Sequence, residues 1–342
     1  MRCFLSCLFL FLSSCLYADT LNKFVVFGDS LSDNGNLYEY MKHQLPISPP
    51  YYQGRFTNGP VWIENLAESY YGKEANKYLL DYAFGGSGVS ESDDDDDFES
   101  GALFNLKREV DSYLLSHHDK ADDKTLFVMW MGSNNYIALP DNPEKTLLAV
   151  NDGIQKELER LVARGGKYFM VMTVPDLGRT PGAIEFDAID FLIDLTEKHN
   201  AMIKARVDLL QAKYPDVTWI FFDVNSIFLT ALDEPDYYGF RNTTETCYES
   251  AMVQPSSKTV LKMAASIQPK TNPEACDGYL FFDIIHPTAP AHIYIADEAH
   301  RMLEAAGIRF EKTISGFTAY PAQTGNEILT GLKRHGPQDI SL

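Results

Sequence analysis

Short, almost wholly apolar segments alternate along this chain with longer segments in which apolar residues recur at every third or fourth position. The short segments are residues 23–28, 125–132, 167–174 and 217–223, with a weaker one at residues 79–84. Such runs are typical of parallel strands buried on both faces, because helices cover the two sides of such a sheet. We therefore predict a single α/β domain with a doubly wound, mostly parallel sheet. Its functional site should lie at the carboxyl ends of the strands.

Amphipathic helices are expected between the predicted strands. Residues 142–164 and 188–214 carry apolar side chains at helical spacing. A further helix should begin at Pro290, because proline fits the first turn of a helix. It should end at Gly307, because glycine commonly follows the last turn.

The first 18 residues differ in composition from the rest of the chain. Arg2 is followed by an apolar run over residues 3–12 and then by small residues up to Ala18. This pattern predicts a signal peptide that is removed after Ala18, and the apolar run is too short to span a membrane. In an alternative interpretation, Cys15 of a Leu-Ser-Ser-Cys sequence is lipidated, as in bacterial lipoproteins. Either way, the protein is expected to be secreted or periplasmic.

Cysteine usage agrees with export. Three of the five cysteines lie in or beside the signal segment, which leaves Cys247 and Cys276. In an oxidising compartment this pair predicts a disulfide, and two free thiols are the alternative. The bridge would contribute about 3–4 kcal/mol to stability by closing its loop. The sequence contains no Cys-x-x-Cys pair and no His-Glu-x-x-His motif, so we expect neither a metal nor a cofactor.

The formal net charge of −19 restricts the partners of the chain. A potential of this sign repels phosphate backbones, which argues against nucleic-acid binding. It also opposes electrostatic docking to anionic lipid, although transient apolar contact with a membrane surface stays open. We expect neutral or zwitterionic partners.

Three segments interrupt the alternating pattern. Residues 93–97 are five consecutive aspartates, which form either a solvated loop or, less simply, a cation site. Residues 230–277 have no clear period and are interpreted as an insertion, whose second half the predicted disulfide closes. The disulfide-closed loop is either a lid over the site or a loop that the disulfide only stabilises. The last segment, residues 311–342, is polar and is interpreted as an extension beyond a domain at residues 19–310.

Candidate catalytic residues begin at the end of the first predicted strand. Ser30 follows Gly28 at an expected strand-to-helix turn, where glycine provides backbone freedom and the N–H groups of a new helix are free. Such a position suits a nucleophile, although a serine there also serves as a helix cap. Near the other end of the domain, Asp283 and His286 are three residues apart, so the carboxylate can orient the imidazole.

Two further segments are suited to stabilising an oxyanion. Gly86 lies in a glycine-rich stretch after a predicted strand and can expose a backbone N–H. Asn134 follows another predicted strand, and its carboxamide can donate a hydrogen bond. Serine, glycine, asparagine, acid and histidine thus occur in this order, with the first three at strand ends. This combination predicts nucleophilic catalysis in which an oxyanion is stabilised.

In these motifs the chain resembles the GDSL, or SGNH, hydrolases. The four signature blocks of that family match at Gly28-Asp29-Ser30-Leu31, Gly86, Gly132-x-Asn134 and Asp283-x-x-His286. The resemblance extends over residues 24–307. Residues 27–36 and 54–62 are similar in particular to the bacterial secreted branch that contains phospholipases A, lysophospholipases A and glycerophospholipid:cholesterol acyltransferases.

The resemblance implies a flavodoxin-like SGNH-hydrolase fold and a role for each matched residue. Ser30 would attack the ester carbonyl, His286 would transfer the proton, and Asp283 would orient His286. The oxyanion would be bound by the N–H groups of Ser30 and Gly86 and by the side chain of Asn134. The implied substrate is a phospholipid or lysophospholipid, with a sterol as an optional acyl acceptor. A carbohydrate esterase, a short-chain arylesterase and a non-catalytic binding member of the fold are the alternatives.

Two positions depart from the pattern of the family. Asn135 stands where many members have aspartate, and Asp81 stands where many have asparagine. Neither position has one of the catalytic roles above. We therefore expect changes in neighbouring hydrogen bonds rather than in the activity.

Overall fold

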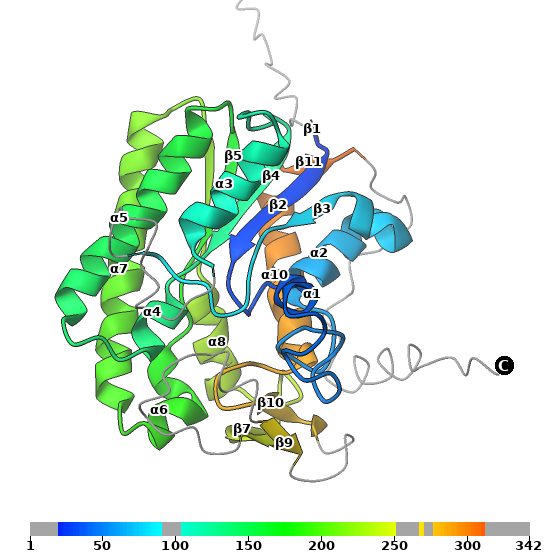
Figure 1. Ribbon diagram of the computed structural model, residues 1–342, viewed down its shortest axis with the longest axis vertical. Helices are drawn as coiled ribbons and strands as arrows, with labels where there is room; N and C mark the ends of the chain where they lie inside the picture. Colours follow the sequence, from blue (N-terminus) through cyan, green and yellow to red (C-terminus); the bar gives the residue numbers. More distant parts are fainter. Residues whose placement is uncertain (1–19, 91–103, 251–266, 270–275, 312–342) are drawn as a thin grey trace, which may run out of the picture.

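The computed structural model describes residues 20–90, 104–250, 267–269 and 276–311. Within them, a parallel five-stranded sheet forms the centre of the molecule (Figure 1). Its strands are β2 (Lys23–Gly28), β3 (Leu79–Asp81), β4 (Thr125–Trp130), β5 (Tyr168–Met172) and β6 (Thr218–Phe222). They are arranged in the order β3-β2-β4-β5-β6, and all neighbours pair in parallel. The predicted doubly wound α/β domain is confirmed.

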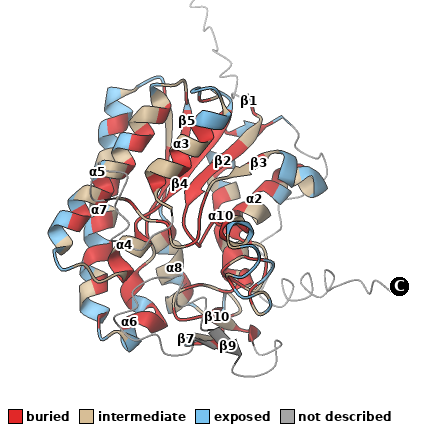
Figure 2. Cartoon of the chain, in the orientation of Figure 1, coloured by how far each residue is buried: buried red, intermediate tan, exposed pale blue. Residues whose placement is uncertain are grey.

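Helices cover both faces of this sheet. The bounds of the helices are α1 Asn36–Tyr40, α2 Trp62–Tyr71, α3 Leu106–Ser116, α4 Ser133–Ile137, α5 Pro143–Val162, α6 Pro181–Glu185, α7 Ile189–Lys213, α8 Val224–Asp233 and α10 Ala289–Ala305, with short 3₁₀ turns at Gly72–Lys77 and Leu177–Arg179. One face packs against α3, α5 and α7, and the other packs against α2 and α10. Figure 2 shows the buried residues concentrated on the strands and on the inward sides of these helices.

Alternating side chains of each central strand feed the two cores. In β2, Val25 and Phe27 join the core under α3, whereas Phe24 and Val26 join the core under α2 and α10. All four side chains are fully buried. This explains why the strand has no polar alternation: both of its faces need apolar residues.

The strand order creates a topological switch point between β2 and β4. The chain leaves β2 for β3 on one side, and it then returns to β4 on the other side. Loops that leave neighbouring strands at such a point diverge and open a crevice at the carboxyl ends of the strands. The segments that contain Ser30 and Asn134 follow β2 and β4 directly, so both border this crevice.

The predicted elements occur, and their ends lie within three residues of the predicted positions. Residues 142–164 and 188–214 contain α5 and α7, and the helix expected from Pro290 begins one residue earlier as α10. The weak run at residues 79–84 contains only the three-residue strand β3.

The ends of the described chain meet beside the central sheet. Strand β1 (Thr20–Leu21) pairs in parallel with β11 (Arg309–Phe310), and the ring of Phe310 stacks on Phe24 at 4.3 Å. The first and last strands of the described residues thereby pair with each other. The predicted signal peptide, the aspartate run at residues 93–97 and all but Glu311 of the predicted extension lie outside the described residues.

Part of the predicted insertion is described. Strand β7 (Asn242–Thr246) pairs with β10 (Tyr279–Phe281), and β8 (Tyr248–Ser250) pairs with β9 (Ile267–Pro269). Among the residues that the structure describes, no helix is long and apolar enough to cross a membrane.

Candidate active site

Ser30 lies in a tight turn that follows β2. The backbone N–H groups of Ser32 and Asp33 both donate to the carbonyl oxygen of Asp29, which closes the turn around the serine. The expected helix does not begin here, because α1 starts only at Asn36. Gly28 was expected to need unusual backbone freedom, but its φ is not positive. It is instead confined by space, since a Cβ there would lie 3.2 Å from the carbonyl oxygen of Trp130.

Asp283 and His286 lie in a second tight turn, between β10 and α10. The N–H groups of Ile285 and His286 donate to Asp283 Oδ1 at 2.9 and 2.7 Å. The N–H of Phe282 donates to the carbonyl oxygen of His286 at 2.8 Å and closes the turn. These backbone hydrogen bonds fix the Asp283 carboxylate independently of its side-chain contacts.

The structure brings the serine, the histidine and the aspartate into one hydrogen-bonded row. His286 Nε2 lies 2.7 Å from Ser30 Oγ, and His286 Nδ1 lies 2.7 Å from Asp283 Oδ2. All three residues are buried, with 4%, 2% and 4% of their surfaces exposed for Ser30, His286 and Asp283. Burial alone would raise the pKa of Asp283, but the charge of His286 and the hydrogen bonds from His286 and Tyr51 outweigh it and lower the pKa. Asp283 is therefore a carboxylate that can stabilise an imidazolium.

Donors suited to an oxyanion surround the tight turn that contains Ser30, here called the nucleophile turn. The turn that contains Asp283 and His286 is called the acid turn. Within the described residues, the N–H groups of Ser30 and Gly86 make no hydrogen bond. Asn134 Nδ2 donates to the carbonyl oxygen of Ser87 at 2.7 Å, which fixes the carboxamide and leaves its second N–H available. Ser30 and Asn134 line the same pocket, whereas Gly86 does not. Gly86 has a φ of +79°, a value that favours glycine.

The two departures from the family pattern have local consequences. Asn135 donates to the carbonyl oxygen of Val89 at 2.8 Å and accepts from its N–H at 2.9 Å. An aspartate could make only the second of these bonds. Asp81 accepts from the N–H of Ala83, and burial raises the pKa of its carboxyl well above the usual range. Both positions thus affect the hydrogen bonds of the glycine-rich segment, as expected.

Glu109 is a buried residue of the site that the sequence analysis missed. Its two carboxyl oxygens accept from the N–H of Gly28 at 2.9 Å and from the hydroxyl of Ser87 at 2.5 Å. It therefore connects the nucleophile turn with the segment that holds Asn134. A glutamate within an amphipathic helix gives no sequence signal for this contact, because the partners are 81 and 22 positions away.

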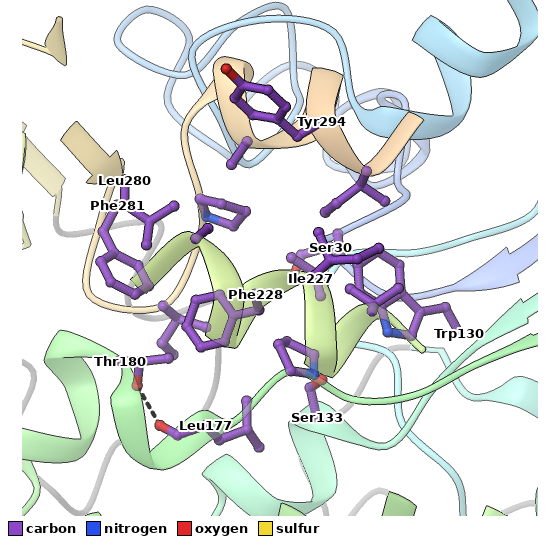
Figure 3. Close-up of a pocket in the computed structure, with 18 of the residues that line it drawn as sticks. Ser30, Trp130, Ser133, Leu177, Thr180, Ile227, Phe228, Leu280, Phe281 and Tyr294 are labelled. Carbon is purple, nitrogen blue, oxygen red and sulfur yellow. Dashed lines mark hydrogen bonds between the residues drawn. The ribbon is translucent and has the colours of Figure 1, made fainter. Parts of the chain in front are cut away.

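A large apolar pocket opens beside Ser30. Its empty volume is about 830 Å³, part of which is open to solvent. Figure 3 shows Ser30 and Trp130 on one side of the pocket and Leu280 and Phe281 on the other, with Phe228 of α8 between them. Polar groups lie mainly at the nucleophile, so the remaining walls provide an almost continuous hydrophobic surface.

The aromatic residues near residue 55 are not part of this pocket. Tyr51, Phe56 and Trp62 follow the nucleophile in the sequence, as does the exposed Tyr52, and such residues could line an acyl or headgroup site. The first three can be compared with the pocket directly. All three are buried, and none of them lines the pocket. Phe56 packs on the ring of His286, with 5.1 Å between the ring centroids, and Trp62 donates to Ser32 Oγ at 3.0 Å.

Cys247 and Cys276 form a disulfide with 5.0 Å between their Cα atoms. The bridge is buried next to the acid turn, because the N–H of Cys247 donates to the carbonyl oxygen of Phe281 at 3.1 Å. The predicted pairing is thus present in the structure.

Similar proteins place this geometry in a known family. The sequence is 29% identical to the phosphatidylcholine-sterol acyltransferase of Aeromonas hydrophila, over 83% of this chain and 90% of that protein. It is 30% identical to the secreted effector protein SseJ of Salmonella typhimurium and 29% identical to the thermolabile hemolysin of Vibrio parahaemolyticus. These two matches cover 80% and 84% of this chain but only 61% and 64% of the relatives.

The family model named GDSL-like Lipase/Acylhydrolase matches residues 24–299. The matched region includes the central sheet except Lys23, together with the nucleophile turn and the acid turn. The chain therefore belongs to the GDSL-like lipases and acylhydrolases, a family of ester hydrolases, as the motif order predicts.

Proposed function

We propose that this protein is a secreted serine esterase that cleaves acyl esters of phospholipids or lysophospholipids. Ser30 Oγ attacks the ester carbonyl carbon, while His286 Nε2 takes the hydroxyl proton and gives it to the leaving alcohol. Asp283 holds the imidazole, and the N–H groups of Ser30, Gly86 and Asn134 bind the oxyanion. A water molecule then attacks the acyl-enzyme with the same histidine as base, which releases the fatty acid and restores Ser30.

One observation carries the proposed substrate class: the pocket that begins at the nucleophile is lined mainly by apolar side chains, with Trp130, Phe228 and Phe281 among them. An acetyl group would contact little of this apolar lining. A long acyl chain would gain about 0.8 kcal/mol for each methylene that it buries there. The pocket therefore favours a lipid ester over an acetylated sugar or a short-chain aryl ester.

Charge and similarity support a zwitterionic lipid. The net charge of −19 opposes anionic bilayers, whereas it leaves choline-type headgroups unaffected. We favour a lysophospholipid, because a single-chain lipid can reach the site from solution or from a micelle during transient surface contact. The similarity to a phosphatidylcholine-sterol acyltransferase over 90% of that protein supports phospholipids as donors and a sterol as a second acceptor.

The remaining parts of the proposal concern export and domain layout. Residues 1–18 would be removed as a signal peptide, residues 19–310 would form the hydrolase domain, and residues 311–342 would extend from it. The exported protein should then begin at Asp19. Its intact mass tests this, because a lipid on Cys15 would add the mass of the acyl chains and of residues 15–18.

The first experiment tests the nucleophile with a fluorophosphonate probe. The wild-type protein should be labelled once per chain, and Ser30→Ala should lose both labelling and ester hydrolysis. Ser112→Ala is the matched control, because Ser112 lies on α3 and donates only to the carbonyl oxygen of Arg108 within that helix. Activity of Ser30→Ala above about one hundredth of the wild type would refute the assignment, because loss of a triad nucleophile usually costs far more. An unlabelled wild-type protein would favour a non-catalytic binding member of the fold.

The second experiment tests the pocket as the acyl site. Ala231 lines the pocket and packs in a cluster with Phe240, Leu280 and Phe281. Trp130, which lies beside Ser30, belongs to a different cluster, so Ala231 is on the part of the wall away from the nucleophile. Ala231→Phe should displace about three methylenes of a bound chain and cost about 2 kcal/mol, roughly a thirtyfold loss in kcat/KM on a palmitoyl ester. Hydrolysis of an acetyl ester should be unchanged.

The matched control is Leu115→Phe, because Leu115 is 84% exposed and lies outside the pocket. Equal effects of Ala231→Phe on acetyl and palmitoyl esters would argue against the acyl site. A wild-type preference for acetylated sugars or short aryl esters would select the alternatives instead.

A third experiment addresses the headgroup and the acceptor. Lysophosphatidylcholine and phosphatidylcholine should be hydrolysed faster than phosphatidylglycerol at low salt. Mass spectrometry of the lipid products, with and without cholesterol, measures the balance between free fatty acid and sterol ester.

A further inference from the structure

The catalytic acid has a buried partner outside the serine–histidine–aspartate row. The Tyr51 hydroxyl donates to Asp283 Oδ2 at 2.6 Å. This is the same oxygen that faces His286 Nδ1 at 2.7 Å. Tyr51 is 2% exposed and stands 232 positions before Asp283 in the sequence, so only the fold brings the two residues together.

The loop that contains Tyr51 is attached to the acid turn at several points. The Thr57 hydroxyl donates to the carbonyl oxygen of Pro287 at 2.9 Å, and the side chain of Asn58 accepts from the N–H of Ala289 at 2.7 Å. The Tyr51 ring also packs on Phe282, with 5.0 Å between the ring centroids. These contacts fix the hydroxyl relative to Asp283 without help from the hydrogen bond itself.

Tyr51 acts as a neutral donor in this position. Burial, the charge of Asp283 and the hydrogen bond to it together raise the pKa of the Tyr51 phenol well above its usual value. The hydroxyl proton therefore remains available to the carboxylate throughout the working pH range. A carboxylate oxygen that receives a second donor holds less charge for the imidazole beside it.

We propose that Tyr51 is a positioning residue that extends the catalytic row to Tyr51–Asp283–His286–Ser30 and moderates the charge that Asp283 presents to His286. This inference rests on the proposed function, because it assumes that His286 acts as the base for Ser30. By sharing the charge of Asp283 Oδ2, the Tyr51 hydroxyl weakens the attraction between that oxygen and an imidazolium at His286. It also adds to the backbone hydrogen bonds from Ile285 and His286 that hold the carboxylate in place.

Other ionisable groups near His286 must be separated from this effect. Asp29 in the nucleophile turn and His292 on α10 both interact with the charge of His286. Burial raises the pKa of Asp29 to about 6 and lowers the pKa of His292 to about 3. His292 is thus neutral near pH 7, whereas Asp29 titrates in the acidic range of both the wild type and a Tyr51 variant. Only the difference between the two proteins reports on Tyr51.

The test measures the rate of fluorophosphonate labelling of Ser30 against pH, which needs the histidine base but no lipid. In Tyr51→Phe, the carboxylate should stabilise the imidazolium more strongly. The acidic limb of the pH–rate profile, where labelling slows as the pH falls, should therefore move to higher pH by about 0.5–1 unit. Tyr248→Phe is the matched control. Tyr248 packs on the same Phe282 ring at 4.8 Å, and among the described residues its hydroxyl makes no bond to Asp283.

A double-variant cycle separates a positioning role from a merely structural one. If Tyr51 acts through Asp283, Tyr51→Phe should change the residual labelling rate of Asp283→Ala less than twofold. The inference would be overturned if the acidic limb of Tyr51→Phe does not move. It would also be overturned if Tyr51→Phe lowers the labelling rate as much in the Asp283→Ala background as in the wild type. Both outcomes count even if Ser30 is labelled normally. Should Tyr51→Phe fail to fold, 2-fluorotyrosine in place of all tyrosines supplies the second measurement. Its more acidic phenol should move the acidic limb downward, and an unmoved limb would again overturn the inference. Absence of labelling in the wild type would instead refute the proposed function.

Discussion

Glu109 provides a test of how the nucleophile turn is held in place. Its carboxyl group is fully buried and accepts from Gly28, two residues before Ser30, and from Ser87, whose carbonyl oxygen holds Asn134. Glu109→Ala would leave the Gly28 N–H and the Ser87 hydroxyl without partners. An unsatisfied buried polar group costs about 1–3 kcal/mol, so the free energy of unfolding should fall by about 2–6 kcal/mol before any cavity is counted. This is a large part of the stability of a typical domain.

Glu109→Gln should behave differently. The amide oxygen can accept from Gly28, and the amide nitrogen can donate to Ser87, whose hydroxyl both donates and accepts. Burial raises the pKa of Glu109 well above its ordinary value of 4.5, although the bonds from Ser87 and Gly28 oppose the rise. The folded state therefore prefers the protonated form. Wild-type stability should fall as the pH rises above the unfolded pKa, until the folded pKa is reached.

Glutamine does not titrate, so the stability of Glu109→Gln relative to the wild type should increase between pH 4 and pH 7. Urea unfolding followed by circular dichroism measures this difference, and labelling by the fluorophosphonate reports on the nucleophile turn. Glu68→Ala is the matched control, because Glu68 is exposed on α2. Equal stability of Glu109→Ala and the wild type, or a relative stability of Glu109→Gln that falls with pH, would refute this account.

Two further predictions concern the oxyanion donor and the disulfide. Asn134→Ala should lower kcat by about two to three orders of magnitude with little change in KM, because its N–H binds charge that develops only in the transition state; a fall confined to KM would contradict this role. Replacement of both Cys247 and Cys276 by alanine should lower the free energy of unfolding by about 3–4 kcal/mol. Urea unfolding measures the loss, and an unchanged midpoint would argue against a stabilising bridge.

The central sheet was predictable because its physical requirement is simple. A strand covered by helices on both faces must be largely apolar, and the buried positions of β2 and β4 satisfy this except for Thr125 at the start of β4. The short strand β3 was harder to delimit. It ends at Asp81, where the Asn36 side chain donates to the carbonyl oxygens of Asp81 and Ala83 in place of a further strand partner. Such side-chain contacts across 45 positions leave no local pattern.

The candidate site was predictable to the extent that its residues form motifs. Ser30, Asp283 and His286 lie in two turns whose local sequences mark them, and the fold places them in contact. Tyr51 and Glu109 were missed as contacts of the site, because each acts on a partner far away in the sequence. A tyrosine in a loop and a glutamate in a helix are common residues in common places. Their function depends on burial, which only the three-dimensional structure reveals.

The disulfide belongs to the hydrophobic cluster that contains Phe282 and Ile284, the two chain neighbours of Asp283. Cys247 and Cys276 are buried with Tyr51, Phe56 and Phe282, and the N–H of Tyr248 donates to the carbonyl oxygen of Phe282 at 3.0 Å. The bridge therefore supports the wall behind Asp283, that is, the packed residues around Phe282. If the bridge acts only through this wall, reduction should slow hydrolysis of a small soluble ester and of a long-chain lipid by the same factor. A gate formed by the loop would affect the lipid far more, because only the larger substrate needs the opening.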